Sequence, residues 1–281
     1  MLPQFIGVTG LPRAGSTLLC QLLAQHPDIR SEGHSSPLAN MLLGLRRMVS
    51  DDSFFLAQLD TDFDLGYGHL RSAMRGFLRG WHDGQPVRAV VDKNRAWLHC
   101  IELLLEVEPT AKLVVCVREL GQVYGSIEAQ HQKTILVDFT DHLADFDRFG
   151  RADMLFSKDK AIGAPLIGLH ALADLPPEVL RHVFVMRFED LAADAAGTMA
   201  RLHTWLGLPV VPFDPANLSV GPRESDSHYR MKYLHRQSST LRAPARHAIS
   251  PRIQAHIEAA YPWFYQAYYP THGKPAGATS G

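Results

Sequence analysis

The sequence contains few cysteines and no long apolar run. Its three cysteines are Cys20, Cys100 and Cys116, an odd number that forms no CxxC pair and no cysteine–histidine cluster. We expect them to be reduced core residues of an intracellular protein. No eighteen consecutive residues are apolar, and the first apolar run starts so soon after Met1 that no room remains for a signal peptide. These absences predict a soluble, cytoplasmic protein without a membrane span.

An excess of charge of one sign is also absent. The 28 lysines and arginines nearly balance the 29 aspartates and glutamates over 281 residues. A whole-molecule basic field of the kind that attracts nucleic acid is therefore excluded, and we expect no nucleic-acid partner. Any anion that the protein binds must be held by a local pocket.

Short continuous apolar runs alternate with helical patterns along the chain. Runs at residues 5–8, 87–91, 113–117 and 182–186 are typical of buried parallel strands, and residues 28–32 add a short strand after the first helix. Apolar residues at helical spacing follow at residues 70–81, 97–105 and 191–206. The alternation predicts one α/β domain over residues 1–270, in which helices flank a central parallel sheet.

The regions that break this alternation lie late in the chain. Residues 134–160 are polar and irregular, which suits a cover over a cleft and an ordinary surface insertion alike. Residues 209–251 show no clean period, and a loop of this length is usually functional or disordered. The aromatic residues of 261–269 predict a C-terminal helix docked on the core, and residues 271–281 a frayed tail.

The stretch GLPRAGST, from Gly10 to Thr17, has the outline of a phosphate-binding loop. A strand that enters a glycine-rich turn and then a helix aims backbone N–H groups and the positive helix end at one point. Ser16 and Thr17 add hydroxyl groups, and Arg13 adds a positive fork. Ser16 stands where a Walker loop has its lysine, and the strand at 113–117 ends without the aspartate that helps hold magnesium. We therefore expect a tetrahedral anion at this loop and no metal.

A second candidate anion site lies at VVCVRELGQVYGS, residues 114–126. A buried strand delivers Arg118 at its carboxyl end, and a helix that begins near Gly121 brings Ser126 back to the same face. Ligands of such sheets gather at the carboxyl ends of the strands. Arg118 and Ser126 are thus expected to hold a second, separate phosphate.

Three segments in the same order resemble a known family. PRAGST at residues 12–17 resembles the 5′-phosphosulfate loop of PAPS-dependent sulfotransferases, and the spacing of Arg118 and Ser126 resembles their 3′-phosphate motif. Residues 184–209 resemble a segment that these enzymes carry late in the nucleotide fold. The resemblance implies a P-loop-like fold that binds 3′-phosphoadenosine 5′-phosphosulfate (PAPS), releases PAP and needs no metal. The donor-binding residues that it implies are Arg13, Ala14, Gly15, Ser16, Thr17, Arg118, Ser126 and Phe188.

The resemblance also implies catalytic roles. Arg13 is expected to contact the leaving-group oxygens, and Lys93, in VVDKNRAW, to reach the sulfuryl group. Arg95 stands where cytosolic members often have a histidine base, and arginine cannot accept the proton. The stretch HPDIRSEGH resembles the tyrosine-directed branch and aligns His34 with that branch's glutamate base. We therefore expect His34 to be the base, with Glu32 as the other candidate or as its orienting partner.

Two parts of the family's pattern differ here. Phe188 stands where the family usually has a tyrosine, so the adenine pocket keeps ring packing and loses a hydroxyl contact. Arg223, Ser225 and Lys232 are candidates to close over the 3′-phosphate.

The acceptor is expected to be a small-molecule or peptidyl hydroxyl, or an amine, in a pocket shaped by residues 35–64, 134–160 and the C-terminal third. A divergent P-loop kinase and a nucleotide-binding protein without catalysis are the alternatives.

Overall fold

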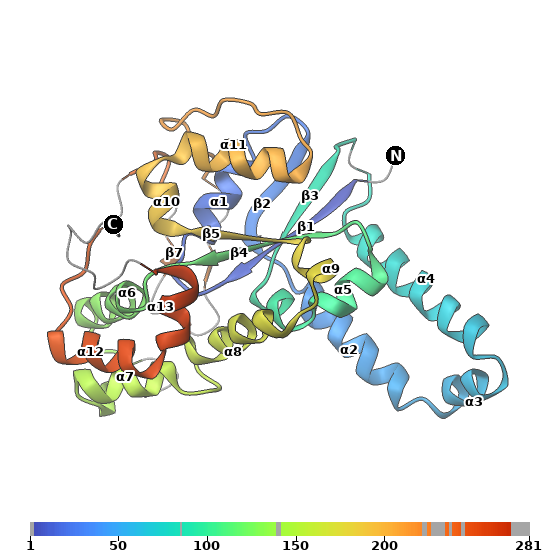
Figure 1. The fold of residues 1–281 in the computed structure, drawn as a ribbon, viewed down its shortest axis with the longest axis horizontal. Coiled ribbons are helices and arrows are strands. Elements are labelled where there is room, and N and C mark those ends of the chain that lie inside the picture. Colours follow the sequence, from blue (N-terminus) through green and yellow to red (C-terminus); the bar gives the residue numbers. More distant parts are fainter. Residues whose placement is uncertain are drawn as a thin grey trace, which may run out of the picture.

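A five-stranded parallel sheet forms the centre of the molecule (Figure 1). The computed structural model describes residues 3–84, 86–138, 142–220, 224–225, 234–235, 238–242 and 245–270. The strand order is β2-β3-β1-β4-β5. The strands are β1 (Gln4–Gly10), β2 (Ile29–Ser35), β3 (Ala89–Lys93), β4 (Lys112–Val117) and β5 (Val183–Arg187). The predicted parallel sheet, flanked by helices in one α/β domain, is confirmed.

Helices cover both faces of this sheet, and a helical arm projects from one side of it (Figure 1). One face carries α1 (Ser16–Leu23), α10 (Phe188–Ala193) and α11 (Ala195–Leu206). The other face carries α5 (Ile101–Val107), α6 (Leu120–Lys133), α8 (Gly163–Ala171), α9 (Pro177–Leu180) and α13 (Pro262–Tyr268), with α7 (Arg148–Phe156) and α12 (Pro251–Ala260) beyond α6. The arm consists of α2 (Leu38–Ser50), α3 (Ser53–Thr61) and α4 (Phe63–Trp81). Three 3₁₀ turns, η1 (Arg95–His99), η2 (Leu143–Asp145) and η3 (Leu172–Asp174), and a two-residue pair, β6 (Glu224–Ser225) and β7 (Leu234–His235), complete the described elements.

The burial of the strands follows their place in the sheet. Ile6 and Val8 of β1 and Val114 of β4 are fully buried, as the continuous apolar runs predict for central strands. The prediction of a buried strand at residues 182–186 is wrong in its burial, because β5 is an edge strand and Val185 is 39% exposed. A continuous apolar run does not distinguish an edge strand from a central one.

Two helical patterns are interrupted in the structure. The spacing over residues 191–206 predicts one helix, but Asp194 leaves the helical conformation and caps α11 by accepting a hydrogen bond from Gly197 N at 2.8 Å. The pattern over residues 97–105 likewise divides into η1, which Asn94 caps, and α5. A capping side chain therefore marks where α11 and η1 begin, whereas α5 begins without one, and the apolar spacing runs through both breaks.

Strand β2 carries a bulge near its carboxyl end. Ser31 pairs with Val91 and Ser35 pairs with Lys93, so the residues between them on β2 outnumber those on β3. The bulged residues are Glu32, Gly33 and His34, and Gly33 adopts a φ of +77° that glycine tolerates best. Bulges re-aim side chains and are frequent beside active sites.

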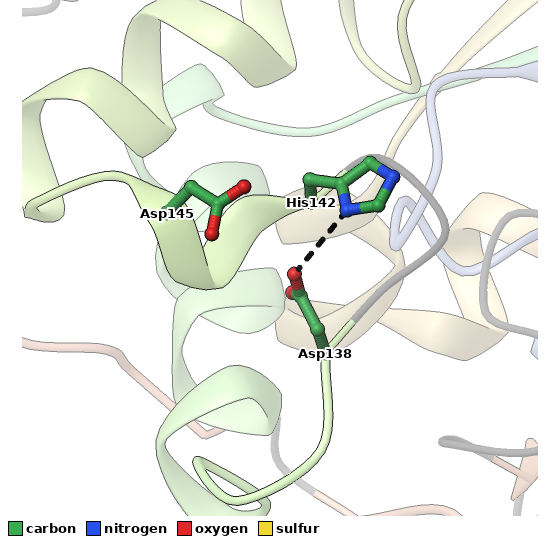
Figure 2. Close-up of side chains that lie close together, drawn as sticks. All are labelled: Asp138, His142 and Asp145. Atoms are coloured by element: carbon green, nitrogen blue, oxygen red, sulfur yellow. Dashed lines mark ion pairs between the residues drawn. The ribbon is translucent and has the colours of Figure 1, made fainter.

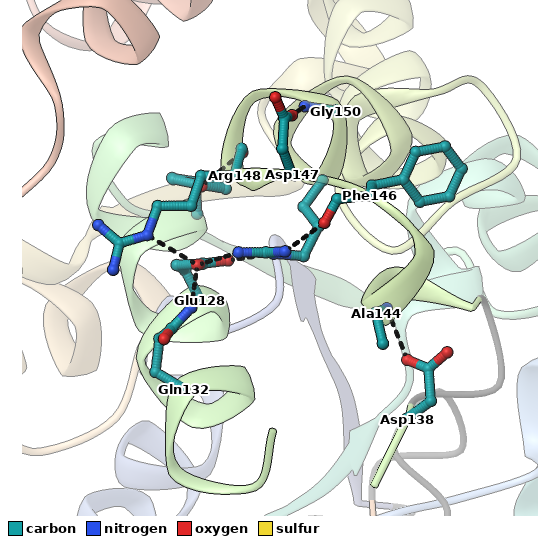
Figure 3. A network of polar contacts seen from close by, with 10 residues as sticks. Glu128, Gln132, Asp138, Ala144, Phe146, Asp147, Arg148 and Gly150 are labelled. Carbon is teal, nitrogen blue, oxygen red and sulfur yellow. Dashed lines mark hydrogen bonds and ion pairs between the residues drawn. The ribbon is translucent and has the colours of Figure 1, made fainter. Parts of the chain in front are cut away.

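The second half of the segment at residues 134–160 is packed against the body of the protein. Glu128 of α6 accepts hydrogen bonds from Arg151 of α7 at 2.6 and 2.8 Å. Gln132 also donates to Glu128, at 2.7 Å, and Arg148 lies 3.6 Å from it (Figure 3). Burial alone raises the pKa of Glu128, but the bonds from Arg151 and Gln132 outweigh it and leave that pKa below its ordinary value. Arg151 also donates to the carbonyl of Phe146. This half is therefore a fixed part of the fold.

The C-terminal helix docks on the core as the aromatic cluster predicts, with Phe264 fully buried. No helix in the described ranges is both long and apolar enough to cross a bilayer. Arg223, Lys232 and the predicted tail at residues 271–281 lie outside the described residues, and so does the side chain of Ser225.

Candidate functional site

Each strand of the sheet ends beside a residue that the sequence analysis selects. His34 lies one residue before the end of β2, Lys93 ends β3, and Arg13 follows β1 in the loop. Arg118 directly follows β4, and Phe188 directly follows β5. Because the strand order is β2-β3-β1-β4-β5, these five residues lie along one edge of the sheet in the order given. The connections after β1 and β4 diverge to opposite sides, which makes their junction the switch point where such sheets bind ligands.

The loop after β1 contains backbone conformations with positive φ, which glycine adopts readily and other residues adopt only at an energetic cost. Gly10 has a φ of +120°, and a Cβ there would lie 2.1 Å from the carbonyl oxygen of Cys116. Leu11 N donates to that same oxygen at 2.9 Å, which ties the loop to β4. Arg13 has a φ of +59° and Gly15 a φ of +84°. A left-handed arginine is uncommon and costs conformational energy, which makes the loop a functional candidate on geometry alone.

Helix α1 begins directly after this loop. Its first turn carries no acidic side chain that would neutralise the positive dipole end and the free N–H groups. Ser16 and Thr17 open the helix, and Ala14 before it is buried. Lys93, only 8% exposed, donates to Thr17 Oγ1 at 3.0 Å. The structure thus brings the predicted lysine of β3 onto the loop.

The loop and the second motif are in direct contact. Arg13 Nε donates to Ser126 Oγ at 3.0 Å, and Arg118 donates to the carbonyl oxygen of Arg13 at 3.1 Å. Helix α6 begins at Leu120, as the spacing predicts, and places Ser126 on the loop side. The two candidate anion sites are therefore neighbours.

Arg118 is a buried cation whose partners are neutral. It is 6% exposed and donates to the carbonyls of Arg13 and Ala245, and no carboxylate of the described ranges lies within ion-pair distance of it. The Phe188 ring covers its guanidinium at 4.7 Å, and a Cβ on Gly15 would lie 2.5 Å from that ring. Burial lowers the pKa of Arg118, Glu189 opposes that shift and Arg13 adds to it. A buried positive charge of this kind is suited to an anion.

The sequence analysis missed a network of glutamate and tyrosine side chains next to Arg118. Glu119 N donates to Glu189 Oε1 at 3.1 Å, Tyr265 OH donates to Glu119 Oε1 at 2.7 Å, and Tyr269 OH donates to Glu189 Oε2 at 2.7 Å. Gln254 also donates to Glu119, at 2.9 Å. Burial first, and then the neighbouring carboxylate, raises the pKa of both tyrosines. The aromatic character of the two tyrosines predicted that they pack on the core. Nothing in the sequence indicated that their hydroxyls bond to the glutamates beside Arg118.

The sequence analysis also missed that the C-terminal segment around His247 packs on α6. Gln122 accepts from His247 N at 2.9 Å and donates to His247 O at 3.1 Å, and Gly125 permits this approach because a Cβ there would lie 2.6 Å from His247 Cβ. Burial, and then the charges of Arg118 and Arg13, lower the pKa of His247. The segment lies close in sequence to the predicted candidates Arg223, Ser225 and Lys232 but is distinct from them. The spacing of Gly121 and Gly125 was the available signal of close packing.

At the β2 end of the edge, His34 and Glu32 lie next to each other in the bulge. His34 Nε2 is 3.4 Å from Glu32 Oε2, and Arg30 donates to Glu32 Oε1 at 2.6 Å. The hydrogen bond from Arg30 lowers the pKa of Glu32 despite the opposing effect of burial. A carboxylate held in this way is a weak proton acceptor, whereas it stabilises a protonated imidazole beside it.

One group of side chains outside this edge has the spacing of metal ligands. Figure 2 shows Asp138, His142 and Asp145 turned toward one another, with ligand atoms within 4.8 Å and His142 Nδ1 4.0 Å from Asp138 Oδ2. His142 and Asp145 are exposed, and Asp138 Oδ1 accepts from Ala144 N at 2.8 Å. The cluster belongs to the connection between α6 and α7 and not to the elements that carry Arg13, Lys93 or Arg118.

The fold and the site define an α/β protein with a glycine-containing loop and a buried arginine at adjacent strand ends. The sulfotransferase family model matches residues 3–212, and the chain belongs to this family. Protein-tyrosine sulfotransferase 1 of Mus musculus is 33% identical over 117 residues, which is 41% of this chain and 30% of the mouse protein. The Danio rerio protein of the same name is 31% identical over 160 residues, or 56% of this chain and 41% of that protein.

A solved structure supports the fold over nearly the whole chain. The sulfotransferase domain from the curacin biosynthetic pathway superposes with a TM-score of 0.51 at 16% identity, over 93% of this chain and 98% of the domain. By contrast, the chain spans less than half the length of the curated relatives given above.

Proposed function

We propose that the chain is a PAPS-dependent sulfotransferase that passes the sulfuryl group to a hydroxyl or amine acceptor by in-line displacement without a metal. The observation that carries this proposal is Arg118, a buried guanidinium with no carboxylate partner in the described ranges, in contact with the loop at residues 13–17. Two adjacent anion sites of this kind suit a donor that carries a 5′-phosphosulfate and a 3′-phosphate.

The order of the candidate residues along the sheet edge implies an orientation of the bound donor molecule relative to the strands. The 5′-phosphosulfate lies on the α1 N-terminus with Arg13, Ala14, Gly15, Ser16 and Thr17 around it. The 3′-phosphate lies on Arg118 and Ser126, and the adenine lies toward Phe188 at the β5 end. This places the sulfuryl group toward β3 and β2, where Lys93 and His34 lie.

The chemistry then needs one proton acceptor and stabilisation of the leaving group. The acceptor oxygen forms a bond to sulfur while the bond from sulfur to the 5′-phosphate oxygen breaks, and PAP leaves with the electron pair. His34 takes the acceptor's proton, and the ionised Glu32 stabilises the resulting imidazolium. Arg13, Lys93 and the α1 N–H groups stabilise the charge that develops on the leaving phosphate.

The side of the site where His34 lies is more exposed to solvent than the side where Arg118 lies. The His34 side chain is 41% exposed, in contrast to the buried Arg118. The names of the curated relatives make a tyrosine-containing peptide the first acceptor to examine, beside small alcohols and amines. All three cysteines are buried free thiols, which supports our proposal of a cytoplasmic location.

Transfer of label from PAPS to a panel of peptides, alcohols and amines, with and without EDTA, tests the function. The proposal expects transfer that chelation leaves intact, and stabilisation by PAP that exceeds stabilisation by ATP with magnesium in thermal shift. Magnesium-dependent transfer from ATP would indicate a kinase instead. Binding of PAP without transfer to any acceptor would indicate a nucleotide-binding protein that lacks catalysis.

A further inference from the structure

Two carboxylates adjoin Arg118 without pairing with it. Glu119 is its chain neighbour, and Glu189 follows Phe188, whose ring covers the guanidinium. Glu189 influences Arg118 electrostatically, yet within the described ranges neither carboxylate lies within ion-pair distance of it. A buried arginine close to two acidic side chains would ordinarily form a salt bridge.

Hydrogen bonds hold both carboxylates in other directions. Both oxygens of Glu189 are occupied, one by Glu119 N and the other by Tyr269 OH at 2.7 Å. The Glu119 carboxylate caps α6 through Gly121 N at 3.0 Å and Gln122 N at 2.8 Å. These contacts fix the directions in which the two carboxylates point, and neither direction brings an oxygen to Arg118.

Tyr269 is itself held firmly by its neighbours. Its ring packs against Phe264 at 5.7 Å between centroids, and the Arg187 guanidinium lies 5.7 Å from the ring centre. Arg187 is fixed in turn by two hydrogen bonds to Asp190, at 2.6 and 2.8 Å. The tyrosine hydroxyl therefore has a defined position relative to Glu189.

We propose that Tyr269 is a positioning residue for the donor site, because its hydroxyl keeps the Glu189 carboxylate away from Arg118 and leaves that guanidinium available to the 3′-phosphate. This inference rests on the proposed function in naming the 3′-phosphate as the anion. The C-terminal helix, which the sequence analysis expected only to complete the core, thereby takes part in nucleotide binding.

Removal of the Tyr269 hydroxyl takes away one hydrogen-bond donor of the Glu189 carboxylate. The freed carboxylate oxygen would be a half-buried acceptor that has lost its hydrogen-bond donor, which is unfavourable. Rotation of the side chain toward Arg118 gives that oxygen a charged donor. The same ion pair then competes with the incoming phosphate for the guanidinium.

Calorimetric titration with PAP tests this competition. For Tyr269→Phe we expect PAP affinity about tenfold weaker, the loss typical of one charge-assisted contact. Tyr268→Phe is the matched control, because its hydroxyl makes no hydrogen bond within the described ranges, and it should bind like the wild type. Adding Glu189→Gln to Tyr269→Phe should restore affinity, because a neutral amide does not pair with Arg118. Unchanged affinity in Tyr269→Phe, or a double variant as weak as the single one, overturns the proposal.

A ligand-free crystal structure of Tyr269→Phe tests, without any nucleotide, whether the Tyr269 hydroxyl keeps Glu189 away from Arg118. The proposal expects a Glu189 oxygen within ion-pair distance of Arg118; a Glu189 side chain that keeps its original direction overturns it. Failure of the wild type to bind PAP would reject the proposed function, whereas this structure would still decide whether Tyr269 controls Glu189.

Discussion

The two halves of the sheet edge differ in how firmly they hold their side chains. The half that we propose to bind the donor (the donor half) lies at the ends of β1, β4 and β5. It has Arg118 at 6% exposure inside a network of hydrogen bonds. The half that we propose to bind the acceptor (the acceptor half) lies at the end of β2, where the chain continues into the arm. It has His34 and Glu32 in a bulge, with side chains 41% and 51% exposed. Helix α3 of the arm buries no residue at all. The molecule thus combines a firmly held half with a more exposed one, an arrangement that suits the constant donor and the variable acceptor of our proposal.

Loss of the proposed base should give the largest effect and should affect turnover alone. His34→Gln is expected to reduce turnover by about 10² to 10⁴-fold, the usual contribution of a general base, while PAP affinity stays unchanged. Steady-state rates with labelled PAPS and titration with PAP measure the two quantities. His69→Gln, on an exposed position of α4, serves as the control. Full turnover in His34→Gln would remove this residue from the base role.

Loss of the buried arginine should affect the donor half alone. Arg118→Met is expected to weaken PAP binding by about 10 to 100-fold, because one charged hydrogen-bonding group is removed. The matched variant in the acceptor half is Arg30→Ala, which removes the partner of Glu32 and should leave PAP affinity unchanged. An equal loss of PAP affinity in Arg118→Met and Arg30→Ala would show that both halves contribute to PAP binding, which contradicts this prediction.

Two glycines with similar backbone conformations offer a sharper comparison of the halves. A Cβ on Gly15 would lie 2.5 Å from the Phe188 ring, whereas a Cβ on Gly33 would meet nothing within 4 Å. Both Gly→Ala variants incur about 1–2 kcal/mol of left-handed strain, and overpacking adds about 1–3 kcal/mol for Gly15→Ala alone. Denaturant unfolding should show this difference, and only Gly15→Ala should lose PAP affinity. Equal destabilisation would contradict the close packing of Phe188 on the loop.

The smallest expected effect concerns acid stability behind the donor half. His203 of α11 is buried with both ring nitrogens lacking partners in the described ranges, and its ring lies 4.9 Å from that of His26. Burial, and then His26, lower the pKa of His203 from its ordinary 6.5. The unfolded chain therefore binds more protons below pH 6.5, and stability falls as the pH drops through that value, by at most about 1.4 kcal/mol per pH unit.

Unfolding free energies of the wild type and His203→Leu between pH 7.5 and 5 check this prediction. The variant should lose part of the pH dependence, and His69→Gln should retain it. A free energy of unfolding of the wild type that rises as the pH drops would contradict the lowered pKa of His203.

The sequence predicted the parts of the site that depend on local pattern. Continuous apolar runs located the strands, and the residues at their carboxyl ends, Lys93 and Arg118, follow from the rule that parallel strands end at one edge. The burial of β5 could not be predicted, because edge position depends on strand order. The bulge at Glu32, Gly33 and His34 was equally hidden, because register is set by pairing with β3.

The parts that the sequence did not predict are contacts between segments far apart in the chain. Tyr265 and Glu119 are 146 residues apart, and Ala245 and Arg118 are 127 residues apart. No local periodicity reports such pairs, since each residue alone has an ordinary role as a core aromatic or a loop residue. Their position depends on how the C-terminal helices dock, which is a property of the whole fold.

The structure of the protein crystallised with PAP tests the central claim most directly. The account predicts the 5′-phosphate on the loop at residues 13–17, the 3′-phosphate on Arg118 and Ser126, and the adenine toward Phe188. A nucleotide bound in the opposite direction along the sheet edge, or bound away from Arg118, would contradict it.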